Sequence, residues 1–206
     1  MVSRPLRAAA FAALVAAAGC AQSTETHVAR TATEQLLIAR AADRAAEGLT
    51  LPLPRGARVL VDDAYFRADG GAYAVSAIRA ALSKAGYALA ASREEADAVL
   101  ELRAGALSLE QMRRLVGLPA MAVPVTEQLN VVSLPELSVY SRRDRIGVAE
   151  FSGFLYEPDT GAPLGAISPM TGEYRIRSHK LLMILNWGHQ AVQPGEIDPG
   201  DSWLEW

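Results

Sequence analysis

Beyond residue 30, the hydrophobic positions follow a helical period in two segments. Residues 31–34 have the Thr-x-x-Glu form of a capping box, and small and aliphatic residues then recur at helical spacing up to Gly48. A second amphipathic pattern covers residues 73–85 and stops at Gly86. The sequence therefore predicts two principal helices.

Short strands are predicted around the second helix. Residues 58–62 are centred on three consecutive aliphatic side chains, residues 87–90 form a short apolar segment, and residues 98–103 alternate between apolar and other residues. Together with the intervening helix, these segments predict a β-α-β-β unit over residues 57–104.

The second half of the chain has strand patterning with ambiguous stretches. Residues 109–116 are compatible with a short helix, and residues 117–126 contain two prolines that suit neither a helix nor a central strand. Strand patterns return at 136–140 and 146–156, with the charged residues 142–145 as the expected turn between them.

Three further elements are expected after residue 156. A Pro-Asp-Thr-Gly turn at 158–161 precedes a brief strand at 164–167. Residues 174–187 fit either one long strand or a strand that bends near Lys180. The whole pattern predicts an α+β fold, a single domain with a mixed, mainly antiparallel sheet and two principal helices.

The N-terminus has the features of a secretory signal. Arg4 and Arg7 precede an uncharged run at residues 8–18, and small residues follow directly before Cys20. The run is too short for a membrane-spanning helix, which needs about 20 apolar residues. We therefore predict a signal peptide over residues 1–19.

The sequence Ala17-Ala18-Gly19-Cys20 resembles a bacterial lipobox, although Ala17 stands where leucine is usual. The resemblance implies that Cys20 carries a diacylglycerol and an N-acyl chain such as palmitate. These chains hold a protein on a bilayer without a spanning segment. A plain secreted protein is the alternative. Ala21, rather than Asp, follows the cysteine, which favours the outer membrane, with the domain facing the periplasm.

These features divide the chain into four parts. Residues 1–19 are the signal peptide, and residues 20–30 are the lipidated cysteine and a polar tether. Residues 31–189 form the single α+β periplasmic domain. Residues 190–206 are acidic, lack periodicity and are predicted to be a flexible tail.

Composition narrows the class of protein. The net charge is −3, and removal of residues 1–19 takes away two arginines and makes it −5, so nothing favours nucleic acid as a partner. One cysteine excludes a disulfide framework, and three histidines leave little basis for a metal site. No cofactor other than the lipid on Cys20 is expected.

Many short segments resemble an uncharacterised family of small bacterial lipoproteins, built on a domain of unknown function. The matching segments span nearly the whole chain after the lipobox: 31–38, the strand near Val61, 77–79, Leu82, 96–99, 105–108, 147–149, 160–161 and 178–180. The resemblance implies no catalytic residues. The chain has a looser, fold-level likeness to curli-secretion-type and other helper envelope lipoproteins, carried by residues 84–87 and 96–97.

Motifs with known chemistry are weak in this chain. Asp159-Thr160-Gly161 spells the aspartic-protease triplet, but it has no second copy and lies in a polar turn. Adjacent residues Ser178 and His179 would point to opposite faces of a strand and so cannot form a nucleophile–base pair by themselves. An enzyme is therefore not expected.

Contact surfaces are the better candidates. Arg142, Arg143 and Arg145 are placed to meet lipid phosphates or another partner, and Trp187 ends an apolar run that follows basic residues. Trp203 and Trp206 lie in the acidic tail and suit a partner's groove.

The function predicted from the sequence is thus a non-enzymatic binding or assembly module of the bacterial envelope, whose partner is another envelope protein or a second copy. The alternatives are an envelope hydrolase that uses His179 and an oligomeric secretion or pore-associated lipoprotein.

Overall fold

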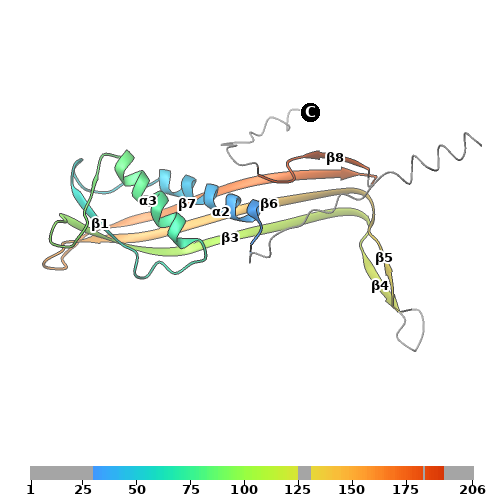
Figure 1. The fold of residues 1–206 in the computed structure, drawn as a ribbon, viewed down its shortest axis with the longest axis horizontal. Coiled ribbons are helices and arrows are strands. Elements are labelled where there is room, and N and C mark those ends of the chain that lie inside the picture. The colour runs from blue at the N-terminus through green and yellow to red at the C-terminus, as the bar shows by residue number, and fades with distance from the viewer. Residues whose placement is uncertain (1–29, 125–130, 183, 193–206) are drawn as a thin grey trace, which may run out of the picture.

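The computed structural model describes residues 30–124, 131–182 and 184–192. Helix α2 (Ala32–Glu47) begins as predicted at Thr31, whose hydroxyl oxygen accepts a hydrogen bond from the amide of Glu34 at 3.3 Å. It ends at Gly48, and helix α3 (Gly71–Lys84) covers the second predicted helical segment. Both helices lie on one side of a long sheet (Figure 1).

The sheet has six strands in the order β2-β1-β3-β6-β7-β8. β1 is parallel to both β2 and β3, and the remaining pairs are antiparallel, so the sheet is mixed but mainly antiparallel, as predicted. Its strands are β1 (Arg58–Asp62), β2 (Ala88–Leu89), β3 (Ala98–Leu118), β6 (Leu137–Tyr156), β7 (Pro163–Leu181) and β8 (Leu185–Gly188). The predicted β-α-β-β unit is confirmed as β1-α3-β2-β3.

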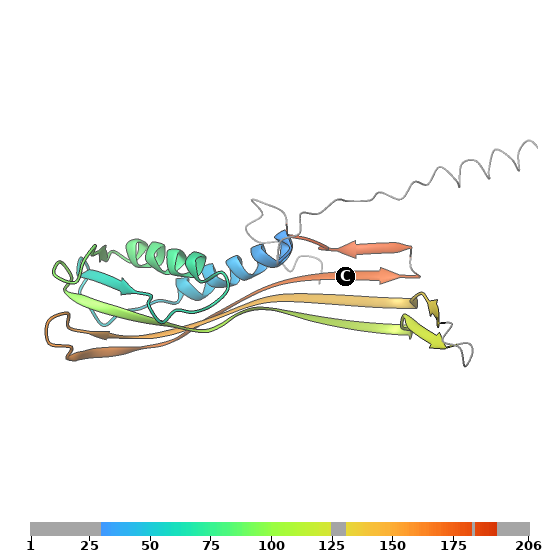
Figure 2. The ribbon, with the colours of Figure 1, turned by 60° about the horizontal axis from the view of Figure 1, so that its bottom comes forward.

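Strands β3, β6 and β7 are each about twenty residues long and run far beyond the helices (Figure 2). The short helix considered for residues 109–116 is wrong, because these residues lie within β3. The turn expected at 142–145 is also wrong, because these residues pair on both sides inside β6. The brief strand at 164–167 is the beginning of β7.

These errors share a physical cause. The outer parts of the three strands lie beyond the helices, so both of their faces carry charged and polar side chains. Strands of that kind lack the one-sided hydrophobic alternation by which strands are found in sequences. A run of arginines therefore looks like a turn.

The chain reverses at the end of β7, which decides between the two alternatives for residues 174–187. Leu182 adopts a positive φ of 50°, and its amide donates to the carbonyl of Val139 at 2.7 Å. β8 then returns along β7, pairing Leu185 with Leu181 and Trp187 with His179. A short two-stranded sheet, β4 (Met121–Pro124) and β5 (Val131–Leu134), extends from the ends of β3 and β6.

The core lies where α2 packs on β6 and β7. An added Cβ at Gly147 would lie 2.2 Å from the carbonyl oxygen of Leu37, and one at Gly172 would lie 2.2 Å from that of Ala41. The helix backbone therefore rests directly on the sheet backbone at two points. Phe151, Leu102 and Leu155 are fully buried close to this contact.

Because the approach leaves no space for a side chain, Gly172→Ala is expected to lower the free energy of unfolding by about 1–3 kcal/mol. Gly48→Ala is the control, since its added methyl meets a single atom at 3.4 Å. Urea unfolding of both variants measures the difference. Equal stabilities would show that the helix does not rest on Gly172.

Candidate functional site

The part of the sheet beyond the N-terminus of α2 is the main candidate for a functional surface. We call it the distal blade and define it as residues 110–118, 137–146 and 175–188, excluding 183. Apart from its root at Ile176, which belongs to the buried core, no helix of the described chain covers it, and its strands continue the register of the buried sheet (Figure 2). We call the face toward the helices the helix face and the other the open face.

Side chains alternate between these faces along β6. Gly147 lies against α2, so Arg143 and Arg145 project on the helix face, and Arg142 and Asp144 project on the open face. The three arginines singled out in the sequence are therefore not one cluster. The sequence did not reveal this division, because the segment looked like a turn.

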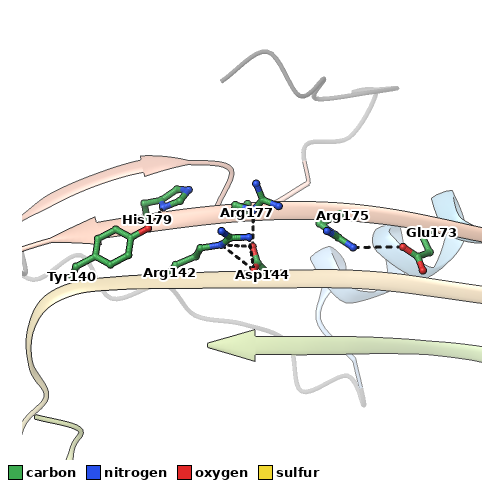
Figure 3. Close-up of polar contacts among 7 residues, drawn as sticks. All are labelled: Tyr140, Arg142, Asp144, Glu173, Arg175, Arg177 and His179. Atoms are coloured by element: carbon green, nitrogen blue, oxygen red, sulfur yellow. Dashed lines mark hydrogen bonds and ion pairs between the residues drawn. The ribbon is translucent and has the colours of Figure 1, made fainter. Parts of the chain in front are cut away.

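Asp144 is the centre of an ion-pair network on the open face (Figure 3). Arg142 contacts its carboxylate at 2.9 Å, and Arg177 from β7 contacts it at 2.8 Å. Only 8% of the Asp144 side chain is exposed. Burial acts to raise the pKa of Asp144, but hydrogen bonds from the two guanidinium groups outweigh it and hold the pKa below its usual value.

His179 lies beside this network and is held by two aromatic neighbours. Its Nδ1 lies 2.8 Å from the Tyr140 hydroxyl, and its ring stacks on Trp187 with a centroid separation of 5.2 Å. Burial and the nearby Arg142 and Arg177 lower the pKa of His179. These contacts favour a neutral imidazole that locks β8 onto β7.

The arrangement around His179 does not assemble the chemistry of a hydrolase. Ser178 lies on the other face of the sheet, opposite Arg143. Asp159 lies in the turn after β6, where the Thr160 hydroxyl donates to the Glu157 carboxylate at 2.7 Å. Within the described ranges, no group of three or more metal-ligating side chains comes together.

Two grooves flank α2 nearer the core. A cavity of about 860 Å³ lies between α2 and α3, with Arg44, Glu47 and Lys84 in its wall. A second, of about 680 Å³, lies toward the N-terminus of α2 beside Leu36 and Tyr73. The Tyr73 hydroxyl donates to Asp43 at 3.0 Å, an interaction that ties α3 to α2.

Exposed hydrophobic side chains gather at the far end of the molecule. Of the fourteen large hydrophobic residues exposed among those described, all but Tyr65, Tyr73 and Leu89 lie on the distal blade or the β4–β5 hairpin. They are Met112, Val116, Leu118, Met121, Leu134, Leu137, Val139, Leu182, Ile184, Leu185 and Trp187. Such a concentration is typical of an interaction surface.

Two long strand edges are also open. β1 pairs with β3 only over Ala98–Glu101, and β8 pairs with β7 only over Ser178–Leu181. Along the rest of these strands the outer edges have no strand partner within residues 30–124, 131–182 and 184–192. Unpaired edges of this length offer a row of backbone donors and acceptors to another strand.

Three of the residues predicted to be functional, Cys20, Trp203 and Trp206, lie outside the described residues. Trp187 lies on β8 and is 44% exposed, with its ring against His179. Helices α2 and α3 both lack the length and hydropathy that a membrane span requires.

A small α+β domain with an extended antiparallel blade is the class that this geometry defines. The chain belongs to a family of unknown function (DUF6655), whose model matches residues 15–179. This confirms the membership in an uncharacterised family that the sequence predicted.

A similar solved structure is that of lipoprotein GNA1162 from Neisseria meningitidis. It shares 15% sequence identity over 68% of this chain and 90% of that chain, with a TM-score of 0.32. No curated protein matches this chain.

The Asp144 network gives a stability prediction with a defined pH dependence. Asp144→Asn is expected to lower the free energy of unfolding by about 2–4 kcal/mol at pH 7, because two guanidinium groups lose their shared counter-charge. Because the pKa of Asp144 is lower in the folded protein, the ionised carboxylate contributes its full stabilisation above about pH 4, where the carboxyl of the unfolded chain is also ionised. This stabilisation is lost as the pH falls through the lower pKa of the folded state.

Urea unfolding at pH 7 and pH 3 tests this expectation, and the gap between wild type and variant should narrow at pH 3. Glu173→Gln is the matched control, because its ion pair with Arg175 is exposed and should contribute less than about 0.5 kcal/mol. A gap that stays constant across this range would contradict the assignment.

Proposed function

We propose that this protein is lipid-anchored through Cys20 at the bacterial outer membrane, faces the periplasm, and acts by binding as an assembly module rather than by catalysis. The observation that carries the binding role is the gathering of exposed hydrophobic side chains at one end of the molecule. Burying them against a partner would remove a large apolar area from water.

The position of α2 supports an anchor near that same end. The N-terminus of α2 points toward the distal blade (Figure 1). Gly147, beside Leu37 of α2, lies ten residues after Leu137, which is the distal end of β6, a span of about 33 Å. The twelve residues from Cys20 to Ala32 can extend up to about 40 Å, so the tether is long enough for the blade to stand at the membrane.

The open edges favour self-assembly as the mode of binding. The unpaired edges of β3 and β7 lie on opposite sides of the sheet, and the unpaired part of β7 ends where β8 begins to pair with it at Ser178. Copies that join through opposite edges make a head-to-tail contact, which repeats into a ring where the rotation between copies closes and into an open filament where it does not. This supports the oligomeric secretion or pore-associated alternative as a more specific form of the same proposal.

Cys20→Ser tests the anchor. The variant is expected to lose the mass of the acyl chains and to leave the outer-membrane fraction in a density gradient, because it lacks the thiol that accepts the diacylglycerol. Mass spectrometry and fractionation give the readouts, with Ser23→Ala as the control. Acylation or outer-membrane location in the Cys20→Ser protein would overturn the anchor, and wild type in the inner membrane would overturn the location.

The native mass of the full-length, detergent-extracted protein tests the assembly role. We expect a homo-oligomer or a stoichiometric complex that dissociates in the double variant Val116→Ser and Leu137→Ser, since both exposed side chains lie on the distal blade. Tyr65→Ser, in the loop between β1 and α3 and outside the distal blade, should leave the mass unchanged. A wild-type protein that is strictly monomeric and carries no partner would contradict the proposal.

A further inference from the structure

Basic side chains from the three long strands converge on the helix face of the distal blade. Arg113 on β3 lies directly opposite Arg143 on β6, and Arg145 follows two residues along the same strand. Lys180 on β7 lies opposite Ser141, which is two residues from Arg143 along β6. Four positive charges thus meet on one face, next to where α2 begins.

This cluster has little opposing charge. Arg113 forms an ion pair with Glu136, whose pKa is lowered by a hydrogen bond with Ser138 and, to a smaller extent, by Arg113 and Lys180. Within the described ranges, Arg143, Arg145 and Lys180 form no ion pair with a carboxylate. Asp144, the adjacent acid, projects on the open face, where Arg142 and Arg177 already surround it.

Like charges held this way oppose folding. Directly opposed like charges destabilise a strand pair, and Arg143 and Arg145 are separated by about 7 Å along the strand. Burial and the proximity of Arg143 together lower the pKa of Arg145, the direction expected when a charge lacks a counter-ion. A bound anion would remove the repulsion.

The cluster surrounds a pocket of about 290 Å³. Ser141 and Ser178, which lie on the same strands as the cationic side chains, also line it, as do Asn186 and Gln190 from the chain that follows β7. The backbone carbonyl of Gln190 accepts a hydrogen bond from Arg145 Nη1 at 3.3 Å, which holds that guanidinium beside Gln190. The pocket therefore combines several charged donors with uncharged hydroxyl and amide groups.

Phosphate is the ligand group that this chemistry suits. Guanidinium groups bind phosphate oxygens through paired hydrogen bonds, and hydroxyl and amide donors satisfy the remaining oxygens. The pocket is at the small end of the range for ligand sites and has room for a phosphate with a short polar substituent.

We infer that Arg143, Arg145 and Lys180 form a binding site for a phosphate group at the root of the distal blade. The ligand is a phosphate mono- or diester, supplied either by a phospholipid headgroup or by a soluble phosphate compound. The inference concerns a different surface from the apolar end and does not depend on the lipid anchor.

The experiment compares the full-length, detergent-extracted protein with the double variant Arg143→Gln and Lys180→Gln. The matched control is Arg114→Gln and Arg175→Gln, which removes the same charge from the open face of β3 and β7. The unfolding midpoint is measured in sodium phosphate and in sodium chloride of equal ionic strength.

Phosphate raises the unfolding midpoint of any folded protein to some extent, because it is excluded from the protein surface. A bound phosphate adds to this, so the excess of the phosphate effect over the chloride effect should be equal in the wild type and the control and clearly smaller in the helix-face variant. In chloride, the helix-face variant should be at least as stable as the wild type, because repulsion has been removed. This second readout separates loss of the site from failure to fold. Equal effects of phosphate and chloride on the wild type, or a phosphate effect on the helix-face variant as large as that on the wild type, would overturn the inference.

Titration followed by native mass spectrometry distinguishes the two sources. The probes are inorganic phosphate and a short-chain phosphatidylglycerol, with a diacylglycerol of the same chain length as the phosphate-free control. Binding of phosphatidylglycerol alone identifies a headgroup site, and binding of both probes identifies a site that a soluble phosphate also fills. In either case, the helix-face variant should bind at least tenfold more weakly. Binding of neither probe, or equal binding of diacylglycerol, would contradict a phosphate site.

Discussion

Helix α2 touches the sheet backbone to backbone at Gly147 and Gly172, and the rest of the fold is arranged around that contact. The small side chains of Ala41 and Ala45 on the helix permit it, and both are fully buried. Because the helix backbone lies so close to the sheet, the aromatic ring of Phe151 and the leucines of β3 can pack beside the helix and complete the core. The contact also sets where the helix begins along the strands, and therefore where the sheet becomes open on both faces.

The two faces of the distal blade have different electrostatic character for a simple geometric reason. Consecutive residues on a strand point in opposite directions, so one arginine-rich segment supplies both faces. On the open face, Asp144 offsets Arg142 and Arg177. On the helix face, Arg143 and Arg145 have no such acid within the described chain. The Asp144 carboxylate thus compensates positive charge on the open face, whereas the positive charge on the helix face has no such carboxylate among the described residues.

The sequence predicted the helical half of the fold well, because each helix there has a cap or a glycine terminator and a buried face. Thr31 caps α2 as expected, and β1, α3 and β2 lie close to their predicted positions. The distal strands were misread because their charged residues face water on both sides, so neither a period nor a boundary is visible. Arg143 and Arg145 stand out in the sequence individually, but Lys180 and Arg113 come beside them only through strand register, which a single sequence does not display.

The change from a covered to an uncovered sheet also divides the molecule by local stability. The hydrogen bonds of the sheet beneath α2 are shielded by the helix, whereas those near Val116, which is 62% exposed, have no second layer over them. Segments with few buried apolar contacts open at a fraction of the global unfolding free energy. The blade can therefore fray and re-form while the helical end stays native. The outer strands of such a molecule can change conformation on contact with a partner while the core stays folded.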